Sequence, residues 1–156
     1  MKYQRLSQEQ FKEMHQEFIN FLASQSITAN EWEEIKKNKP EVAEEELDIF
    51  SDLIWEGVLR KVKYLEHYSP QHLFLFSMDE DFITLIGIKV KNETINITTR
   101  EGYRWLQQNL THEDVELYTS KKALKADRNK DVFALIQQGA QITKGELFTY
   151  FQKIVD

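Results

Sequence analysis

Acidic residues and one tryptophan on a predicted helix form the strongest chemical pattern in this sequence. Pro40 suits the first turn of a helix, where its missing N–H costs no hydrogen bond, and the helix is predicted to run past Gly57, as far as Leu65. At about 100° per residue, five acids fall within a sector of roughly 80°, with Trp55 at its edge. These five acids, called the acidic row below, are Glu41, Glu45, Asp48, Asp52 and Glu56.

A row of carboxylates beside an aromatic ring is a surface on which a lysine- or arginine-rich partner can dock. Opposite charge steers the encounter, and the ring supplies apolar area that becomes buried. The alternative is a solvated helix face with the tryptophan packed under another element. We expect a non-enzymatic protein-interaction or regulatory module, with a basic protein or a second copy of the chain as partner. The candidate binding residues are Glu45, Asp48, Asp52, Trp55 and Glu56.

The same carboxylates leave open a metal- or carboxylate-dependent enzyme. A hard divalent cation such as Mg²⁺ takes oxygen ligands, but one straight helix supplies two at best. The others would come from Asp79, Glu80 or Asp81 in a predicted turn. Glu46 lies inside the apolar sector of the helix, where it could act as an acid or base or could reach solvent or a lysine. No pattern implies a cofactor or a bound metal, and we expect neither.

Several catalytic classes are excluded by composition and spacing. The chain has no cysteine, so it has no thiol nucleophile, thiolate metal site or disulfide. His112-Glu113 lacks the second histidine of a zinc-protease helix. Five glycines are too few for a dinucleotide loop, and in Gly139–Gly145 the lysine precedes the second glycine, unlike in a phosphate-binding loop.

The charge distribution argues against nucleic acid as a partner. The net charge is -6, and residues 31–56 hold ten acids against three lysines. Nucleic-acid binding is driven by neutralisation of phosphates, so it is disfavoured here. The one basic segment, Lys121–Lys130, could instead meet the acidic face of a second copy. Stretches without a charge, such as His67–Met78 with 12 residues, are too short to span a membrane. We expect a cytoplasmic protein that does not bind membranes.

Hydrophobic spacing and capping patterns predict helices at both ends of the chain. Ser7 with Gln10, and Thr28 with Glu31, form capping-box patterns that open helices to about Gln25 and Asn38. His15 falls on the apolar face of the first of these, as a core residue. After the strands, helices are predicted over about 99–110 and 132–138, with a last one after Thr143.

Residues from His72 onward show the two-residue period of strands. His72–Ser77, Phe82–Val90 and Thr94–Thr99 predict a three-stranded antiparallel meander, and Val115–Thr119 predicts a fourth strand. The segment 120–131 is either a loop or a solvated helix. The sequence therefore predicts one α+β domain over residues 1–156, with N-terminal helices, the meander, a crossover helix, the fourth strand and C-terminal helices.

This predicted order also matches a restriction-endonuclease-like core, which makes a remote or inactive nuclease-like fold part of the enzyme alternative. Asp79 and Asp81 could supply the metal-binding acid. The third strand, Thr94–Thr99, lacks the acid-x-Lys pair that organises the attacking water, and a shared fold alone implies no function.

Six short segments together resemble an uncharacterised family of small cytoplasmic bacterial proteins, a domain of unknown function. The resemblance spans the whole chain and implies a stand-alone domain, but it transfers no catalytic residue. The segments are FINFLASQS (18–26), KPEVAE (39–44), FSDLIWEG (50–57), YLEH (64–67), IQQGA (136–140) and KGEL (144–147).

Overall fold

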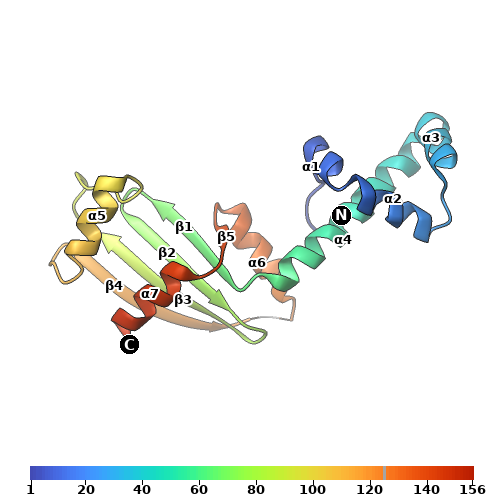
Figure 1. Ribbon diagram of the computed structural model, residues 1–156. Coiled ribbons are helices and arrows are strands. Elements are labelled where there is room, and N and C mark those ends of the chain that lie inside the picture. Colours follow the sequence, from blue (N-terminus) through green and yellow to red (C-terminus); the bar gives the residue numbers. More distant parts are fainter. Residues whose placement is uncertain (125) are drawn as a thin grey trace. The chain divides into compact units, whose positions relative to one another are not determined.

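The chain forms two compact units, Met1–Arg60 and Lys61–Asp156 (Figure 1). The structure is a computed structural model that describes residues 1–124 and 126–156. The first unit is helical, and the second is an antiparallel sheet with helices. The α+β class, with helices at both ends of the chain, is confirmed.

Four helices build the first unit: α1 (Gln8–Glu13), α2 (His15–Ser24), α3 (Ala29–Asn38) and α4 (Pro40–Lys61). The predicted caps are confirmed, because the Ser7 side chain accepts from the Gln10 N–H and the Thr28 side chain accepts from the Glu31 N–H. The single helix expected up to Gln25 is two helices, interrupted at Met14.

Aromatic rings dominate the core of the first unit. The Phe50 ring lies 5.1 Å from Phe18 and 5.9 Å from Phe11, between centroids. Leu6, which precedes every helix, is buried in the same cluster. On α4 the burial does not simply follow hydrophobicity, because Leu53 is 54% exposed while Ser51 is fully buried. The helix turns its acidic side, rather than the Leu53 side, toward the N-terminal residues.

The second unit contains one five-stranded sheet in the order β4-β3-β2-β1-β5. Its strands are β1 (Tyr64–Ser69), β2 (His72–Met78), β3 (Phe82–Val90), β4 (Val115–Ala123) and β5 (Gln141–Thr143). The antiparallel meander is present as β1-β2-β3, and β4 joins the far side of β3. Thr94–Thr99, the expected third strand, lies instead in turns before α5 (Arg100–Gln108), so its assignment as a strand is wrong.

Helices α5 and α7 (Glu146–Val155) cover one face of this sheet, as Figure 1 shows. Leu106 of α5 and Phe148 and Phe151 of α7 are buried there against alternate residues of the two central strands. Those strand residues are Leu73, Leu75, Ile86, Ile88 and Val90.

The opposite face of the sheet meets α6 (Arg128–Gln137) over part of its area. Away from this helix the face carries the half-buried ring of Phe74, 5.6 Å from His72 and 6.1 Å from His67 between centroids. The segment 120–131 was predicted to be either a loop or a solvated helix. Its first residues instead belong to β4, which extends to Ala123, and its last residues belong to α6, which begins at Arg128. Lys125, part of that segment, lies outside the described residues.

None of the helices in the described part of the chain is both long and apolar enough to cross a membrane.

Candidate functional site

The acidic row of α4 carries the chain's own first residues, Met1–Leu6, which we call the N-terminal arm. The Asp52 carboxylate accepts hydrogen bonds from the backbone N–H groups of Lys2 and Tyr3, at 2.8 and 2.9 Å. One turn further along the helix, Glu56 pairs with the Lys2 ammonium at 2.7 Å and accepts a hydrogen bond from the Tyr3 hydroxyl. The two carboxylates thus bind both the backbone and the side chains of the arm.

The second half of the arm is held in the same way toward the start of the helix. The Arg5 guanidinium donates to Asp48 at 2.7 Å and pairs with the Glu44 carboxylate. The Trp55 indole N–H donates to the Gln4 carbonyl at 3.1 Å, so the ring lies against the arm.

Leu6 ends the arm and enters the core beneath it. Its N–H donates to the Ser51 hydroxyl at 3.0 Å, and that hydroxyl donates to the Leu47 carbonyl at 2.7 Å. The buried serine therefore has a partner on both sides, which accounts for a hydroxyl in the centre of an apolar face.

The structure brings four of the five predicted binding residues together around the arm and leaves one out. Asp48, Asp52, Trp55 and Glu56 all contact it, whereas Glu45 is exposed, and no described residue is its hydrogen-bond or ion-pair partner. Glu44 and the whole arm were not predicted from the sequence. A strict four-residue spacing would have indicated Glu44, since it continues the series Asp48, Asp52 and Glu56 toward the start of α4.

The arm runs antiparallel to α4 and bends at Tyr3. Lys2 pairs with Glu56, and Arg5 pairs with Asp48, eight residues earlier on the helix. The bend lets one carboxylate, that of Asp52, accept hydrogen bonds from the consecutive N–H groups of Lys2 and Tyr3, which would point in opposite directions in an extended strand. The arm therefore fits the acidic row through its backbone conformation as well as its charges.

The phenol of Tyr3 provides a test of the arm in solution. Its burial, followed by the hydrogen bond to the nearby Glu56 carboxylate, raises the pKa of Tyr3 to about 12. An unfolded tyrosine ionises near pH 10. The raised pKa of Tyr3 therefore stabilises the folded state fully below about pH 10, and this stabilisation is lost as the pH rises toward 12. We expect the tyrosinate absorbance that is lost in Tyr3→Phe to develop with a midpoint near pH 12. Glu56→Gln should lower that midpoint, and an ordinary midpoint near 10 in the unaltered chain would show that the arm is not docked.

Two of the other acids considered for catalysis, Glu46 and Asp79, have structural partners. Glu46 accepts a hydrogen bond from Gln25 at 2.8 Å, so it is neither isolated nor buried as an acid–base group. Asp79 caps the β2–β3 turn by accepting from the N–H groups of Phe82 and Asp81, at 2.6 and 2.8 Å. These backbone hydrogen bonds, that of Phe82 first, lower the pKa of Asp79. Within residues 1–124 and 126–156, no group of three His, Asp or Glu side chains is placed to hold a metal ion.

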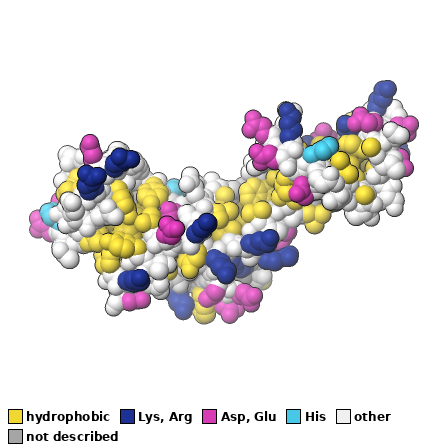
Figure 2. Space-filling model, in the orientation of Figure 1, with side chains coloured by type: hydrophobic (Ala, Val, Ile, Leu, Met, Phe, Trp, Pro, Cys, Tyr) yellow, Lys and Arg dark blue, Asp and Glu magenta, His cyan; other side chains and the backbone are white. Residues whose placement is uncertain are grey.

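A groove of about 610 Å³ lies on the surface of the first unit. Phe18, Ile19, Leu22 and Trp32 line it, and His15 stands at its wall. His15 is exposed, so its predicted place in the core is wrong. Figure 2 shows that apolar side chains reach the surface of the N-terminal helices and are bordered there by charged groups. Two lysines, Lys12 and Lys36, line the groove, and Lys36 pairs with Glu33 at 2.8 Å.

One family model matches the chain over residues 1–156, and it describes a family of unknown function (DUF6495). No curated protein and no solved structure matches the chain.

Proposed function

Because the chain belongs to DUF6495, a family of unknown function, we propose its role from the geometry alone: it is a protein-interaction module without catalytic activity, whose acidic row binds a basic peptide segment. The observation that carries this proposal is the docked arm. A stretch containing lysine, tyrosine and arginine already lies across the row, held by charge-assisted hydrogen bonds.

The arm defines the chemistry of a partner that could replace it. That partner has two cations three residues apart in a short segment without helix, an aromatic residue after the first cation and an apolar residue after the second. The arm competes from within the same chain, with the millimolar effective concentration of a short tether. Binding in trans is therefore selective for partners that add contacts of their own, and the arm acts as a built-in regulator.

Self-association through the basic segment 121–130 has less support. Arg128 of that segment already forms hydrogen bonds within the second unit. Its Nε donates to the Asp79 carbonyl at 3.1 Å, and its Nη2 donates to the Val62 carbonyl. Lys121 lies over the Phe82 ring at 4.5 Å. The arm of a second copy is a better occupant of the acidic row than this segment.

The enzyme alternative also has less support than binding. Glu46 and the Asp79 turn have the structural partners described above, and the nuclease-like analogy depended on a third strand at Thr94–Thr99 that is not formed. Bacterial origin, a cytoplasmic location and avoidance of nucleic acid stay predictions from the sequence.

The test uses the full chain with its arm neutralised by Lys2→Ser and Arg5→Ser. A labelled synthetic peptide with the sequence of Met1–Ser7 is titrated with this variant, and binding is followed by fluorescence anisotropy. We expect saturable binding that is weaker at high salt, and weaker still to the unaltered chain, whose arm occupies the site. Adding Asp48→Asn and Asp52→Asn should weaken binding about tenfold or more, because charge-assisted hydrogen bonds are lost.

Glu45→Gln is the matched control for that experiment. It removes one negative charge from the same helix but touches no part of the arm. Equal weakening by Glu45→Gln and by Asp52→Asn alone would reduce the interaction to general electrostatic attraction and would contradict a defined site.

A further inference from the structure

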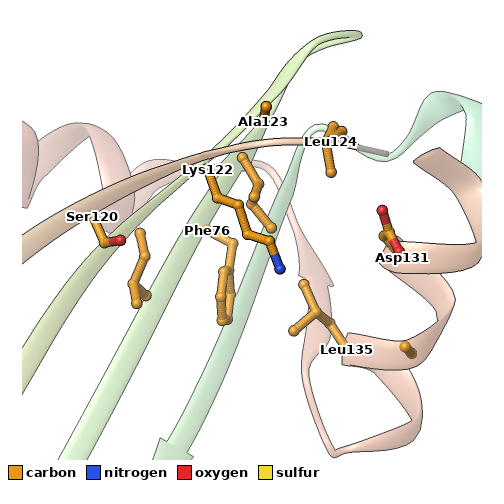
Figure 3. A pocket seen from close by; sticks show the side chains of 10 residues that line it. Phe76, Ser120, Lys122, Ala123, Leu124, Asp131 and Leu135 are labelled. Carbon is orange, nitrogen blue, oxygen red and sulfur yellow. The ribbon is translucent and has the colours of Figure 1, made fainter. Parts of the chain in front are cut away.

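A second site lies wholly within the C-terminal unit, between the sheet and α6. It is a pocket of about 320 Å³, within the size range of small-molecule sites. Its floor consists of Phe76, Ile83 and Leu85 on the central strands, and Leu135 of α6 forms the facing wall. Figure 3 shows Phe76 and Leu135 beside one opening, with Lys122 reaching across it from β4.

Lys122 is the cation of this pocket. Its register opposite Ile83 places it on the same sheet face as the apolar floor. Figure 3 shows its ammonium end turned toward the space beside Leu135, rather than away from the protein. Among the described residues, none forms an ion pair with Lys122, so the charge is available to a ligand. The Ser120 hydroxyl, two residues earlier on the same face, adds a neutral polar group at the edge.

Asp131 stands on the other side of the opening, in the first turn of α6. Its carboxylate disfavours a second negative charge on anything that enters. Among the residues that the structure describes, the lining therefore combines apolar surface, one cation and one opposing anion. We propose that this pocket binds a small aliphatic monocarboxylate, with the hydrocarbon chain over Phe76 and Leu85 and the carboxylate at Lys122. This site is independent of the acidic row of α4.

The strand provides a matched control, because neighbouring residues point to opposite faces of a sheet. Lys121 pairs with Thr84 in the register and lies over the Phe82 ring on the face covered by α7. Lys121→Met and Lys122→Met thus make the same change of charge and shape one residue apart, on opposite sides of the sheet.

The experiment is a titration of the isotopically labelled full chain with octanoate below its micelle-forming concentration, followed by the amide NMR signals of Ile83, Leu85 and Ala134. Binding should be saturable and should strengthen about fourfold per methylene along the series from butanoate to octanoate. Lys122→Met should weaken octanoate about fivefold and leave the neutral analogue octanol unchanged, and Lys121→Met should change neither.

Two further titrations test the pocket and its selectivity. Suberate, a dicarboxylate with the same number of carbons, should bind several-fold more weakly than octanoate, and Asp131→Asn should reduce that difference. Ala134→Phe, which fills the opening, should abolish binding of octanoate and octanol alike. Equal effects of the two lysine variants, equal affinity for suberate and octanoate, or undiminished binding to Ala134→Phe would each overturn the proposal. Far-ultraviolet circular dichroism checks that every variant is folded.

Discussion

Replacing Leu6 with alanine is expected to lower the free energy of unfolding of the first unit by about 2–5 kcal/mol. Leu6 is 7% exposed and packs in one cluster with Phe18, Leu22 and Phe50. Truncation removes the apolar contact and leaves a cavity beneath the arm, since the surrounding rings are fixed by one another.

Native-state hydrogen exchange measures this effect unit by unit. The amides of α2 and α4 should lose protection in Leu6→Ala by the stated amount. Met1→Ala is the matched control, because Met1 belongs to the same arm but is 65% exposed and should change stability by less than about 0.5 kcal/mol. A loss below about 1 kcal/mol in Leu6→Ala would mean that the arm is not packed into the core.

The Leu6 variant also links stability to the proposed function. Leu6 is the apolar anchor of the arm, while Lys2 and Arg5 provide its charge pairs. If the arm regulates the acidic row, then loosening its anchor should increase binding of the basic peptide in trans, even though all the carboxylates are intact. Stability and binding should therefore change in opposite directions in this one variant.

The sequence predicted the character of the acidic row but not its occupant. Four-residue spacing on a helix is a local property, so Asp48, Asp52 and Glu56 were assigned to one side of α4 correctly. Their partner lies about 50 residues away in the chain, at Lys2 and Tyr3, and no periodicity connects this arm to a helix.

Turn chemistry explains the wrong strand. Thr94–Thr99 alternates isoleucine with polar residues, which is the period of a half-buried strand. Two asparagines break that pattern: the Asn92 side chain accepts from the Thr94 N–H, and the Asn96 side chain accepts from the Thr98 N–H. These local hydrogen bonds form turns in place of a strand ladder, and Ile97 is nevertheless buried.

The opposite error occurred at Tyr64–Ser69, where a helix end was expected and β1 was found. The segment is rich in aromatic and polar residues and has no clear alternation. Its strand conformation comes from pairing on both sides, with β2 along its whole length and with β5 at its start. Tertiary pairing of this kind overrides local preference and is not visible in a single segment.

Gly102→Ala is expected to destabilise the second unit by about 3 kcal/mol, at the upper end for overpacking. A Cβ atom at Gly102 would lie 1.7 Å from the Asn96 carbonyl oxygen and 2.4 Å from its carbon. Both atoms are backbone, and the following residue is fixed, because the Ile97 N–H donates to the Pro70 carbonyl at 2.9 Å. The start of α5 would have to move away from the sheet. Denaturant unfolding monitored through the exchange of β2 and β3 amides measures the loss.

Gly57→Ala is the control that isolates this clash from the general effect of the substitution. Gly57 is inside α4, and a Cβ atom there would meet nothing within 4 Å. Alanine restricts the unfolded chain and favours a helix, so this variant should be more stable by about 0.5–1 kcal/mol. The two substitutions are chemically identical and both lie in helices, so only the approach of the Asn96 backbone can give them opposite signs. If Gly102→Ala were neutral or stabilising, then α5 would not be seated against that turn, and the packing of Leu106 on the sheet would need revision.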